Sequence, residues 1–526
     1  MVSSVGVLVF LRRRRAKRSR SGKHVGLTEI PESNKPLNPE PDMPIIPEKR
    51  SKVETLLGNF QLTNTKLQNL MTVLDQEMCK GLNGAPRSEA DIKMFPTFVR
   101  PLSGGSGKGN LLVLDLGNTH LKASLVNLEG TNAQILWSLG YPIPDDKECG
   151  TVGQLFDFMA DCTNAFIKEE NLSGKIPLAL IVGFPCKHTS VGKDCLVKWT
   201  KEVRYSGTDH GDLYTLLLKA VDRRAKQKSG VPRSLDNLRK LKIAAFVNDA
   251  VSTLVSVAFN NSDCKIGLVV DSGFNACYVE DWTHVEMDNT ADKNPREMII
   301  NTELGALGEN GCLDFFRTAY DKELDEYSSS PGTQILEKMV GGRYIGEIVR
   351  LVLKRMTQTD LLFGTVPLTC DLFRKDNITT GCVIIIEGDT KEPHKKTSGV
   401  LDGLGVTYYT DDDLKTVRLV CRAVCERAAY LAAASLATLV NHINQPEVVV
   451  VVDGYLYQNH PHFRDLMYSK TLELLDPGLK FYLESPICDR AVGAARIAAA
   501  SVSSRHKQTV TPDALARHFQ SALNFG

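Results

Sequence analysis

Hydrophobic and polar positions follow a helical rhythm near the start of the folded part of this chain. From Val53, the stretch "VETLLGNFQLTNTKLQNLMTVLDQEMCKGL" carries apolar residues at helical spacing. This spacing predicts two helices, the second of them capped by Thr63 or Asn64. Residues 24–52 contain six prolines and show no period, so we expect an extended linker there and a folded body after it.

After the glycine-rich stretch "SGGSGKGN", the spacing of apolar residues changes from that of helices to that of strands. Apolar runs follow at 111–116, 121–126 and 134–139, then a helical stretch around 152–170, then the run "IPLALIVGFP". Strands in hairpin order that then alternate with helices are typical of a mixed sheet with helices on its faces.

A similar order recurs in the second half of the chain. The strand "LKIAAFVNDA" leads into a helix at 251–259, "KIGLVVDSGFNACYVE" reads as a hairpin, and "EVVVVVDGYLYQ" as a later buried strand. The repetition predicts a duplicated α/β core with a cleft between two lobes, the second lobe decorated by long helical segments at 304–365 and 413–443.

We therefore expect five segments along the chain: a basic segment and linker, helices that pack on the body, a small lobe, a large lobe and a tail. Their predicted boundaries are 1–52, 53–103, 104–247, 248–504 and 505–526.

Charge is distributed unevenly along the chain, although the formal net charge is only +1. Residues 1–23 hold eight basic side chains and no acid, which leaves 55 basic against 62 acidic residues in the rest. The acidic body argues against nucleic-acid binding. The basic segment fits shallow insertion at an anionic membrane face, an organelle presequence, a nuclear import patch or a plain solvated tail.

The 13 cysteines are odd in number and show no CxxC spacing. They predict reduced, mostly buried thiols of a cytosolic type of compartment. Cys421 and Cys425 lie four residues apart in a helical stretch, where we expect two small core residues.

Asp249 ends the apolar strand "AAFVND" beside Asn248. A carboxylate at the end of a buried strand that faces a cleft can take a proton from a substrate hydroxyl while that oxygen attacks phosphorus. The simpler interpretation is an N-cap of the following helix. Other polar groups flanked by glycine, proline or apolar runs are Thr200, Lys201, Asn275, Glu303 and Glu337. If they converge, they suit a polyhydroxylated sugar, whose hydroxyls both donate and accept hydrogen bonds.

Long strings of the sequence resemble the hexokinase family in its animal form, from about residue 53 to about 500. They include "GFPCKHTSVGKDCLVKWTKEV", "AAFVNDAVSTLVSVAF", "INTELGALGENGCLDFFRTAYDKELDEYS" and "VDGYLYQNHPHF". The resemblance implies an α/β, two-lobed actin-like ATPase (ribonuclease-H-like) fold with a sugar and ATP cleft between a small and a large lobe. It also implies ATP-dependent phosphorylation of glucose and related hexoses at the 6-hydroxyl, with ATP and Mg²⁺ as cofactors.

The resemblance assigns roles residue by residue. Asp249 becomes the catalytic base. The sugar contacts implied are Gly183, Thr200, Lys201, Asn248, Asn275, Glu303 and Glu337. The ATP contacts implied are Asp115, Gly117, Asn118, Thr119, Lys122, Asp271, Ser272, Gly273, Asp453, Gly454 and Arg490, with Asp115 holding Mg²⁺ indirectly.

The departures from the family's pattern gather on the ATP side. The family's "DLGGTN" is "DLGNTH" here, so Asn118 stands where glycine would tolerate a positive φ at no cost. The family's "GTGTN" is "DSGFN", in which a carboxylate about 4 Å from a phosphate would cost about 4 kcal/mol unless Asp271 helps to hold Mg²⁺. The family's "SGSGKGAA" is "ICDRAVGAA", where Arg490 could restore a cation, and Tyr455 replaces a serine. On the sugar side only Gly183, which replaces a serine, departs.

Two functions fit these residues. The first is a working hexose kinase of glycolysis. The second is a weak or inactive sugar-binding regulatory protein, in which sugar binding closes the two lobes and a partner recognises the closed form. We expect the protein in the cytosol or at the mitochondrial surface, with the nucleus as a lesser alternative and a peripheral membrane contact through residues 1–23 as one of the options. The oligomeric state stays open.

Overall fold

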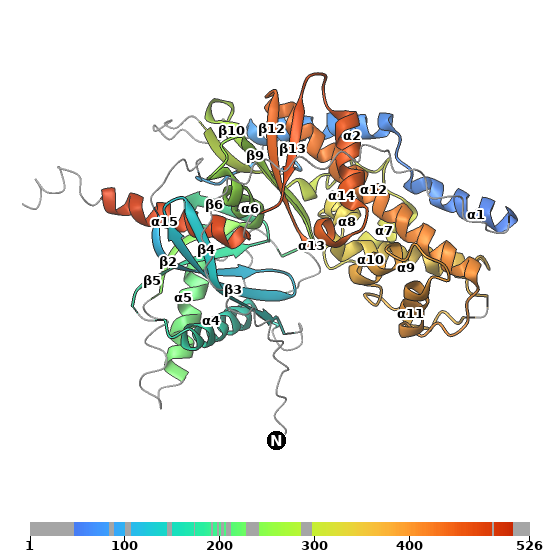
Figure 1. Ribbon diagram of the computed structural model, residues 1–526, viewed down its shortest axis with the longest axis horizontal. Helices are drawn as coiled ribbons and strands as arrows, with labels where there is room; N and C mark the ends of the chain where they lie inside the picture. The colour runs from blue at the N-terminus through green and yellow to red at the C-terminus, as the bar shows by residue number, and fades with distance from the viewer. Residues whose placement is uncertain are drawn as a thin grey trace, which may run out of the picture. The chain divides into compact units, whose positions relative to one another are not determined.

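The computed structural model describes residues 47–83, 89–99, 107–144, 150–172, 174–190, 193–196, 199–200, 205–206, 212–227, 241–285, 297–364, 366–486 and 489–508. The chain divides into one unit of residues 1–44 and another of residues 45–526. All elements described below belong to the second unit (Figure 1).

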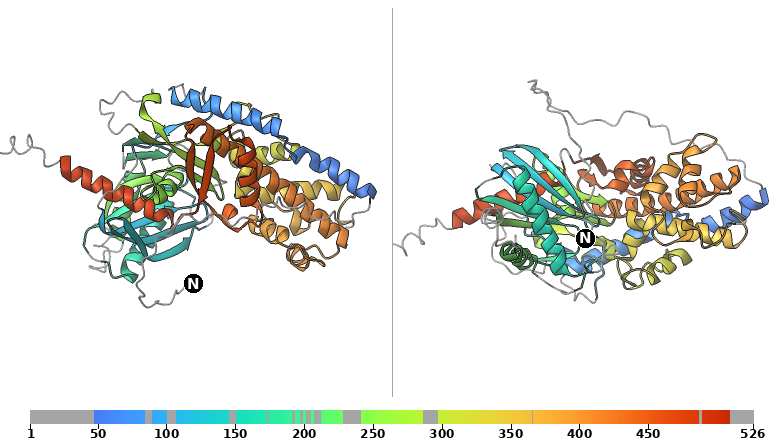
Figure 2. Two further views of the ribbon diagram at one scale, coloured as in Figure 1. Left: turned by 45° about the horizontal axis from the view of Figure 1, so that its top comes forward. Right: turned by 90° about the horizontal axis from the view of Figure 1, so that it is seen from below.

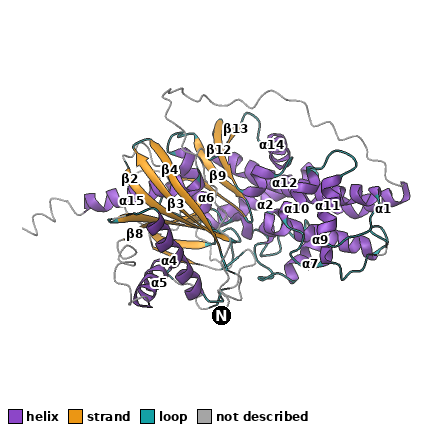
Figure 3. Cartoon of the chain, turned by 60° about the horizontal axis from the view of Figure 1, so that its bottom comes forward, coloured by secondary structure: helices purple, strands orange, loops and turns teal. Residues whose placement is uncertain are grey.

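A five-stranded sheet forms the first half of the core. Its order is β4-β3-β2-β5-β8. The strands are β2 (Lys108–Leu116), β3 (His120–Glu129), β4 (Asn132–Pro142), β5 (Ile176–Val182) and β8 (Leu241–Asn248). The strands β2, β5 and β8 run parallel, whereas β2, β3 and β4 form an antiparallel meander. Helices α4 (Val152–Glu169) and α5 (Leu213–Gln227) cover one face (Figure 3). A small hairpin of β6 (Cys186–Ser190) and β7 (Lys193–Leu196) follows β5.

A six-stranded sheet repeats this pattern in the second half. Its order is β1-β11-β10-β9-β12-β13. The strands are β1 (Phe95–Pro96), β9 (Cys264–Val270), β10 (Phe274–Asp281), β11 (Glu297–Asn301), β12 (Glu447–Asp453) and β13 (Lys480–Glu484). Again three consecutive strands form an antiparallel meander, and two later strands add in parallel. The prediction of a duplicated α/β core is confirmed.

Two helices share one apolar core with strands of both sheets. These are α6 (Asp249–Ala258) and α15 (Arg490–Gln508), whose buried residues pack with Val113 and Ile181 of one sheet and Val451 of the other. A side chain at Gly493 would come within 1.9 Å of the Ser252 carbonyl oxygen, so glycine lets α15 lie directly on α6. This packing places the start of α15 beside the ends of β2 and β12, where the predicted site lies.

Helices make up most of the remaining body. They are α1 (Pro47–Leu57), α2 (Asn64–Leu82), α7 (Ala319–Glu326), α8 (Ile335–Val340), α9 (Gly342–Gln358), α10 (Thr380–Glu387), α11 (Lys395–Gly403), α12 (Asp411–Ile443), α13 (Tyr455–Asn459) and α14 (Phe463–Leu474). The 33-residue α12 is long and apolar enough to cross a membrane, but 83% of its most apolar stretch is buried inside the fold. It is the central helix of a core that also includes residues of α2, α8, α9 and α14 (Figure 2).

Several local predictions are confirmed, and two are wrong. Thr63 caps α2, because its side chain accepts a hydrogen bond from the Lys66 amide, and Cys421 and Cys425 are buried core residues. However, α1 begins at Pro47, inside the predicted linker, since proline suits the first turn of a helix. The predicted strand at 134–139 is confirmed as β4, which is an exposed edge strand.

The segment 304–365 is not one helical stretch. Between β11 and α7 it forms turns, with only a short 3₁₀ helix at Leu304–Ala306. Gly308 and Gly311 adopt positive φ there, a conformation that glycine accepts without strain and that interrupts a helix.

Candidate active site

Three predicted sugar contacts from the six-stranded sheet and its neighbours lie together. The Asn275 side chain donates to Asn301 Oδ1 at 3.0 Å and lies 3.4 Å from Glu303 Oε1. Glu337 accepts a hydrogen bond from the Phe274 amide at 3.0 Å, and a side chain at Gly305 would touch both Phe274 and Glu337. The first turn of α8, the start of β10 and the turn after β11 therefore meet at one point.

Asn248 and Asp249 stand at the junction of β8 and α6, and both are buried. Asn248 is the N-cap, and its Oδ1 accepts from the Ala250 amide at 2.9 Å. Asp249 is the first helical residue, and its Oδ1 accepts from the same amide at 2.9 Å. The N-cap interpretation of Asp249 is therefore wrong, because the neighbouring asparagine performs that role. The second carboxylate oxygen of Asp249 takes no part in the hydrogen bond to the Ala250 amide and can accept a proton from a substrate.

The other predicted sugar contacts come from the opposite sheet. Gly183 follows β5, and Thr200 is buried next to Trp199, whose ring packs edge-on against Phe184 with centroids 4.9 Å apart. Lys201 lies outside the described residues. A sugar that used all predicted contacts would therefore touch side chains carried by both sheets.

The first phosphate loop, between β2 and β3, closes as a tight turn in which the Gly117 amide donates to the His120 carbonyl at 3.0 Å. Among the described residues with positive φ, neither Gly117 nor Asn118 is found, so the expected backbone strain at Asn118 does not occur. Thr119 Oγ1 lies 2.9 Å from His120 Nδ1, and the buried Asn118 Oδ1 has no hydrogen-bond partner among the described residues.

The second phosphate loop, Asp271 to Gly273, is packed against the glycine pair between α8 and α9. Side chains at Gly341 and Gly342 would come within 2.8 Å of the Ser272 and Asp271 carbonyl oxygens. Asp271 Oδ1 accepts a hydrogen bond from the Tyr455 amide at 3.0 Å, at the start of α13. Asp271 replaces the first glycine of the family's motif, and one oxygen of its carboxylate therefore has a structural partner.

Asp453 and Gly454 end β12 beside this loop. Gly454 has a φ of 127°, and a side chain there would lie 2.2 Å from the Val270 carbonyl oxygen, so only glycine fits. Asp453 Oδ1 accepts from the Gly454 amide and from Gln458 Nε2, both at 2.9 Å. Burial raises the pKa of the Asp453 carboxyl, and the guanidinium of Arg490 opposes that rise.

Arg490 joins the first loop to α15. Its Nε and Nη2 donate to the two carboxylate oxygens of Asp115 at 2.7 and 3.1 Å. Burial raises the pKa of Asp115, and Arg490 opposes this rise. Burial would lower the pKa of the Arg490 guanidinium, but three surrounding carboxylates outweigh burial and raise it. Lys122 forms a second ion pair, with Asp489.

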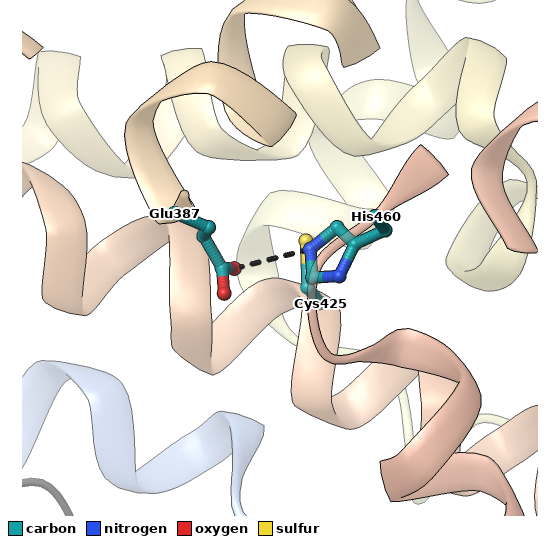
Figure 4. A group of neighbouring side chains, drawn as sticks. All are labelled: Glu387, Cys425 and His460. Atoms are coloured by element: carbon teal, nitrogen blue, oxygen red, sulfur yellow. Dashed lines mark ion pairs between the residues drawn. The ribbon is translucent and has the colours of Figure 1, made fainter. Parts of the chain in front are cut away.

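A separate group of potential metal ligands, Glu387, Cys425 and His460, is fully buried (Figure 4). His460 Nδ1 accepts from the amides of His462 and Phe463 at 3.2 and 3.1 Å, which leaves the ring hydrogen on Nε2, 3.5 Å from Glu387 Oε1. A metal would need a lone pair on Nε2. We therefore interpret this group as a buried polar contact between α10, α12 and the start of α14.

Comparison with known proteins resolves the family. Two models described as Hexokinase match residues 52–259 and 265–500. The hexokinase of Brugia malayi is 32% identical over 452 residues, which cover 85% of this chain and 77% of that protein. Hexokinase-1 of Mus musculus is 35% identical over 436 residues, 81% of this chain and 43% of that protein, so the chain spans less than half of that relative's length.

This chain belongs to the hexokinase family. The structure of a hexokinase from Schistosoma mansoni complexed with glucose matches with a TM-score of 0.80 at 33% identity, over 86% of this chain and 99% of that one. Another hexokinase crystal structure, 24% identical, shares the fold with a TM-score of 0.65. The predicted two-lobed, actin-like fold is confirmed, and the family makes the protein a sugar kinase. The five segment boundaries and the roles of single residues stay predictions.

Sequence reasoning missed two residues of this hexokinase site. Asn301, fully buried at the end of β11, donates to Glu303 Oε1 at 2.7 Å and accepts from Asn275. Gln334, buried with a left-handed φ of 53°, has its side-chain oxygen beside Gly305. The motif "INTELG" contains Asn301, but nothing local distinguishes it from a strand residue.

Proposed function

We propose that the protein transfers the γ-phosphoryl group of ATP to the 6-hydroxyl of glucose and related hexoses. The observation that carries the proposal is the gathering of Asn275, Glu303 and Glu337 beside the six-stranded sheet, in a chain whose hexokinase match covers both halves. Buried carboxylates and amides suit a sugar, because each hydroxyl can donate to a carboxylate and accept from an amide.

Asp249 is the catalytic base of this proposal. Its carboxylate accepts the proton of the 6-hydroxyl as that oxygen forms a bond to the γ-phosphorus and the bond to the β-phosphate oxygen breaks. The position of Asp249 at the start of α6 is fixed, because Asn248 caps the helix and Asp249 itself accepts from the Ala250 amide. A fixed carboxylate loses little entropy when the substrate hydroxyl arrives.

Magnesium bound to ATP would be held through Asp115 and Asp453, whose carboxylates end β2 and β12. These residues fit, because Mg²⁺ prefers oxygen ligands and commonly binds proteins through one or two carboxylates. Asp115 already accepts both donors of the Arg490 fork, but a carboxylate has about four lone-pair directions, which leaves room for metal-bound water. When bound, the metal neutralises charge on the phosphates.

Sugar binding should draw the two sheets together, since Gly183 and Thr200 belong with one sheet and Asn275 and Glu303 with the other. Closure excludes water from the transferred phosphoryl group and limits wasteful ATP hydrolysis. The same closure would serve the alternative, a sugar-binding regulatory protein. That alternative has no specific observation in its favour here.

The test is a coupled assay of the purified protein with glucose and MgATP. Wild type should form hexose phosphate well above the rate of Asp249→Ala, and a panel of hexoses then orders the substrates. If both proteins show the same background rate while glucose still raises thermal stability, kinase activity is excluded and the regulatory function gains support.

We also propose a cytosolic location, with residues 1–23 mediating contact with the mitochondrial surface. Support comes from the eight basic residues that follow an apolar run in this segment. Fusing residues 1–23 to a fluorescent protein tests this, since a nuclear or diffuse signal would contradict mitochondrial contact.

A further inference from the structure

Two ion pairs join the β2–β3 hairpin to the start of α15. Asp115 and Lys122 are directly opposite each other in the antiparallel ladder of β2 and β3. Arg490 pairs with Asp115, and the preceding residue, Asp489, pairs with Lys122. Asp489 also caps α15, because its Oδ1 accepts from the Ala491 amide at 3.1 Å. Neighbouring residues of the helix start are therefore attached to neighbouring residues of the sheet.

The guanidinium of Arg490 is held along one edge and open along another. Nε and Nη2 bind the carboxylate of Asp115 as a fork, which fixes the plane of the group. The nearest acidic atom to Nη1 is Asp453 Oδ2 at 3.9 Å, which is too far for a hydrogen bond. Within the described part of the chain, Nη1 has no hydrogen-bond acceptor, and 16% of the side chain is exposed.

The backbone donors of the two phosphate loops are partly consumed. The Gly117 amide donates to the His120 carbonyl, the Asp271 amide to the Gly273 carbonyl, and the Phe274 amide to Glu337 Oε2. Loops that hold phosphate through backbone amides need such groups unpaired. Here three of them are already engaged before any nucleotide arrives.

The negative charge of the carboxylates around Arg490 also requires a cation if a phosphate group is to bind there. Asp249 and Asp453 both contribute to the electrostatic environment of Arg490, and Asp271 contributes to that of Asp453. A triphosphate that entered among these carboxylates would be repelled, since unlike water the protein interior screens charge poorly. The fixed guanidinium is the group that offsets this repulsion.

We propose that Arg490 binds a phosphoryl group of the nucleotide through its Nη1 edge while Asp115 keeps hold of the opposite edge. The Lys122–Asp489 pair is a positioning device: it fixes the start of α15 and neutralises the acid next to Arg490. In this nucleotide site a side-chain guanidinium thus donates hydrogen bonds to phosphate in place of some of the backbone amides. The proposal rests on the proposed kinase function and deepens it.

The experiment measures binding of the magnesium complex of a non-hydrolysable ATP analogue by isothermal titration, with glucose present. Arg490→Ala should raise the nucleotide Kd about 10- to 100-fold, because it removes a charge-assisted hydrogen bond, and should change the glucose Kd less than about twofold. Arg490→Lys should fall between, since lysine keeps the charge but loses the fork. Arg223→Ala is the matched control, because its pair with Asp157 lies on α5 and α4.

Lys122→Met tests the positioning device. It should raise the KM for MgATP a few-fold at nearly unchanged kcat, because Arg490 itself remains. A purely structural role would lower thermal stability and leave this KM unchanged, which would contradict the positioning role.

Each outcome of the Arg490 variants decides the proposal. An Arg490→Ala protein whose nucleotide Kd stays within about twofold of wild type overturns it, and so does one that binds nucleotide more tightly, since Arg490 would then obstruct the site. If the Arg490→Ala protein does not fold because Asp115 has lost its ion-pair partner, the nucleotide Kd of Arg490→Lys decides instead. Nucleotide binding that depends on Arg490 in a protein without hexose kinase activity would support this inference and refute the proposed function.

Discussion

The sugar side and the phosphate side of this site are held together by different forces. On the sugar side, the carboxylate of Glu303 accepts from the Asn301 side chain and that of Glu337 accepts from the Phe274 amide, and both donors are neutral. On the phosphate side, Asp115 and Asp489 are paired with the cations Arg490 and Lys122. Neutral donors orient these carboxyl groups, whereas ion pairs fix charges that an incoming polyanion must share.

The largest expected effect concerns Asp249, which lies between the two sides. Asp249→Asn keeps the size of the side chain and an oxygen for the Ala250 amide, but it cannot take the proton of the sugar hydroxyl. We expect kcat to fall about 10³-fold at nearly unchanged glucose and nucleotide affinity. Steady-state kinetics with titration of both ligands measures this, with the exposed Asp263→Asn as control. A loss of less than tenfold would remove Asp249 from its proposed role.

Backbone geometry on the phosphate side provides the second test. Gly454→Ala adds an atom 2.2 Å from the Val270 carbonyl oxygen at a φ of 127°, so we expect a loss of about 3 kcal/mol in unfolding free energy and weaker nucleotide binding. Gly478→Ala is the matched control, because Gly478 has a φ of 92° but open space around it. Equal losses in urea unfolding of both variants would show that the close contact does not matter.

An ion-pair cluster remote from both sides gives the third test. His442 Nε2 lies 3.1 Å from Glu280 and Nδ1 lies 3.1 Å from Asp75 of α2. Burial would lower the pKa of His442, but these two carboxylates raise it to about 9. Burial would raise the pKa of Glu280, but hydrogen bonds from His442, Tyr278 and His284 lower it to about 2.

A raised pKa in the folded state stabilises the protein while the histidine is charged. This contribution is complete below about pH 6.5 and is lost as the pH rises to about 9, so unfolding free energy should fall by on the order of 2 kcal/mol over that range. Urea unfolding at both ends of the range measures the fall, and His442→Gln should reduce it. A slope that is the same in both proteins would contradict the assignment.

The smallest expected effect returns to the sugar side. Asn301→Ala removes the donor to Glu303 and the acceptor of Asn275, so the KM for glucose should rise about tenfold with the KM for MgATP unchanged. Asn377→Ala, whose side chain donates to the Asp371 carbonyl at the surface, is the control. If Asn301→Ala raised both KM values equally, the two sides would not be separable as described.

The sequence by itself determined the fold and the residue types of the site. Period-2 and helical patterns located the paired halves, the hairpins of both sheets and the capping of α2 by Thr63, because these depend on local spacing and local hydrogen bonds. The family resemblance singled out Asp249 as the catalytic base, because local sequence alone favours a helix N-cap there. The motif strings of both halves supplied the sugar residues in the same way.

Only the tertiary structure decided how those residues are held. Asn118 takes an ordinary backbone conformation, Asp271 finds the Tyr455 amide, and Arg490 finds Asp115, which is 375 residues away in the chain. No local pattern encodes such partners, because an ion pair or a cap between distant segments forms only after α15 has packed between the two sheets. The physical reason is that spacing along a chain fixes which face a side chain takes, whereas charge and hydrogen bonding depend on whatever the fold brings opposite it.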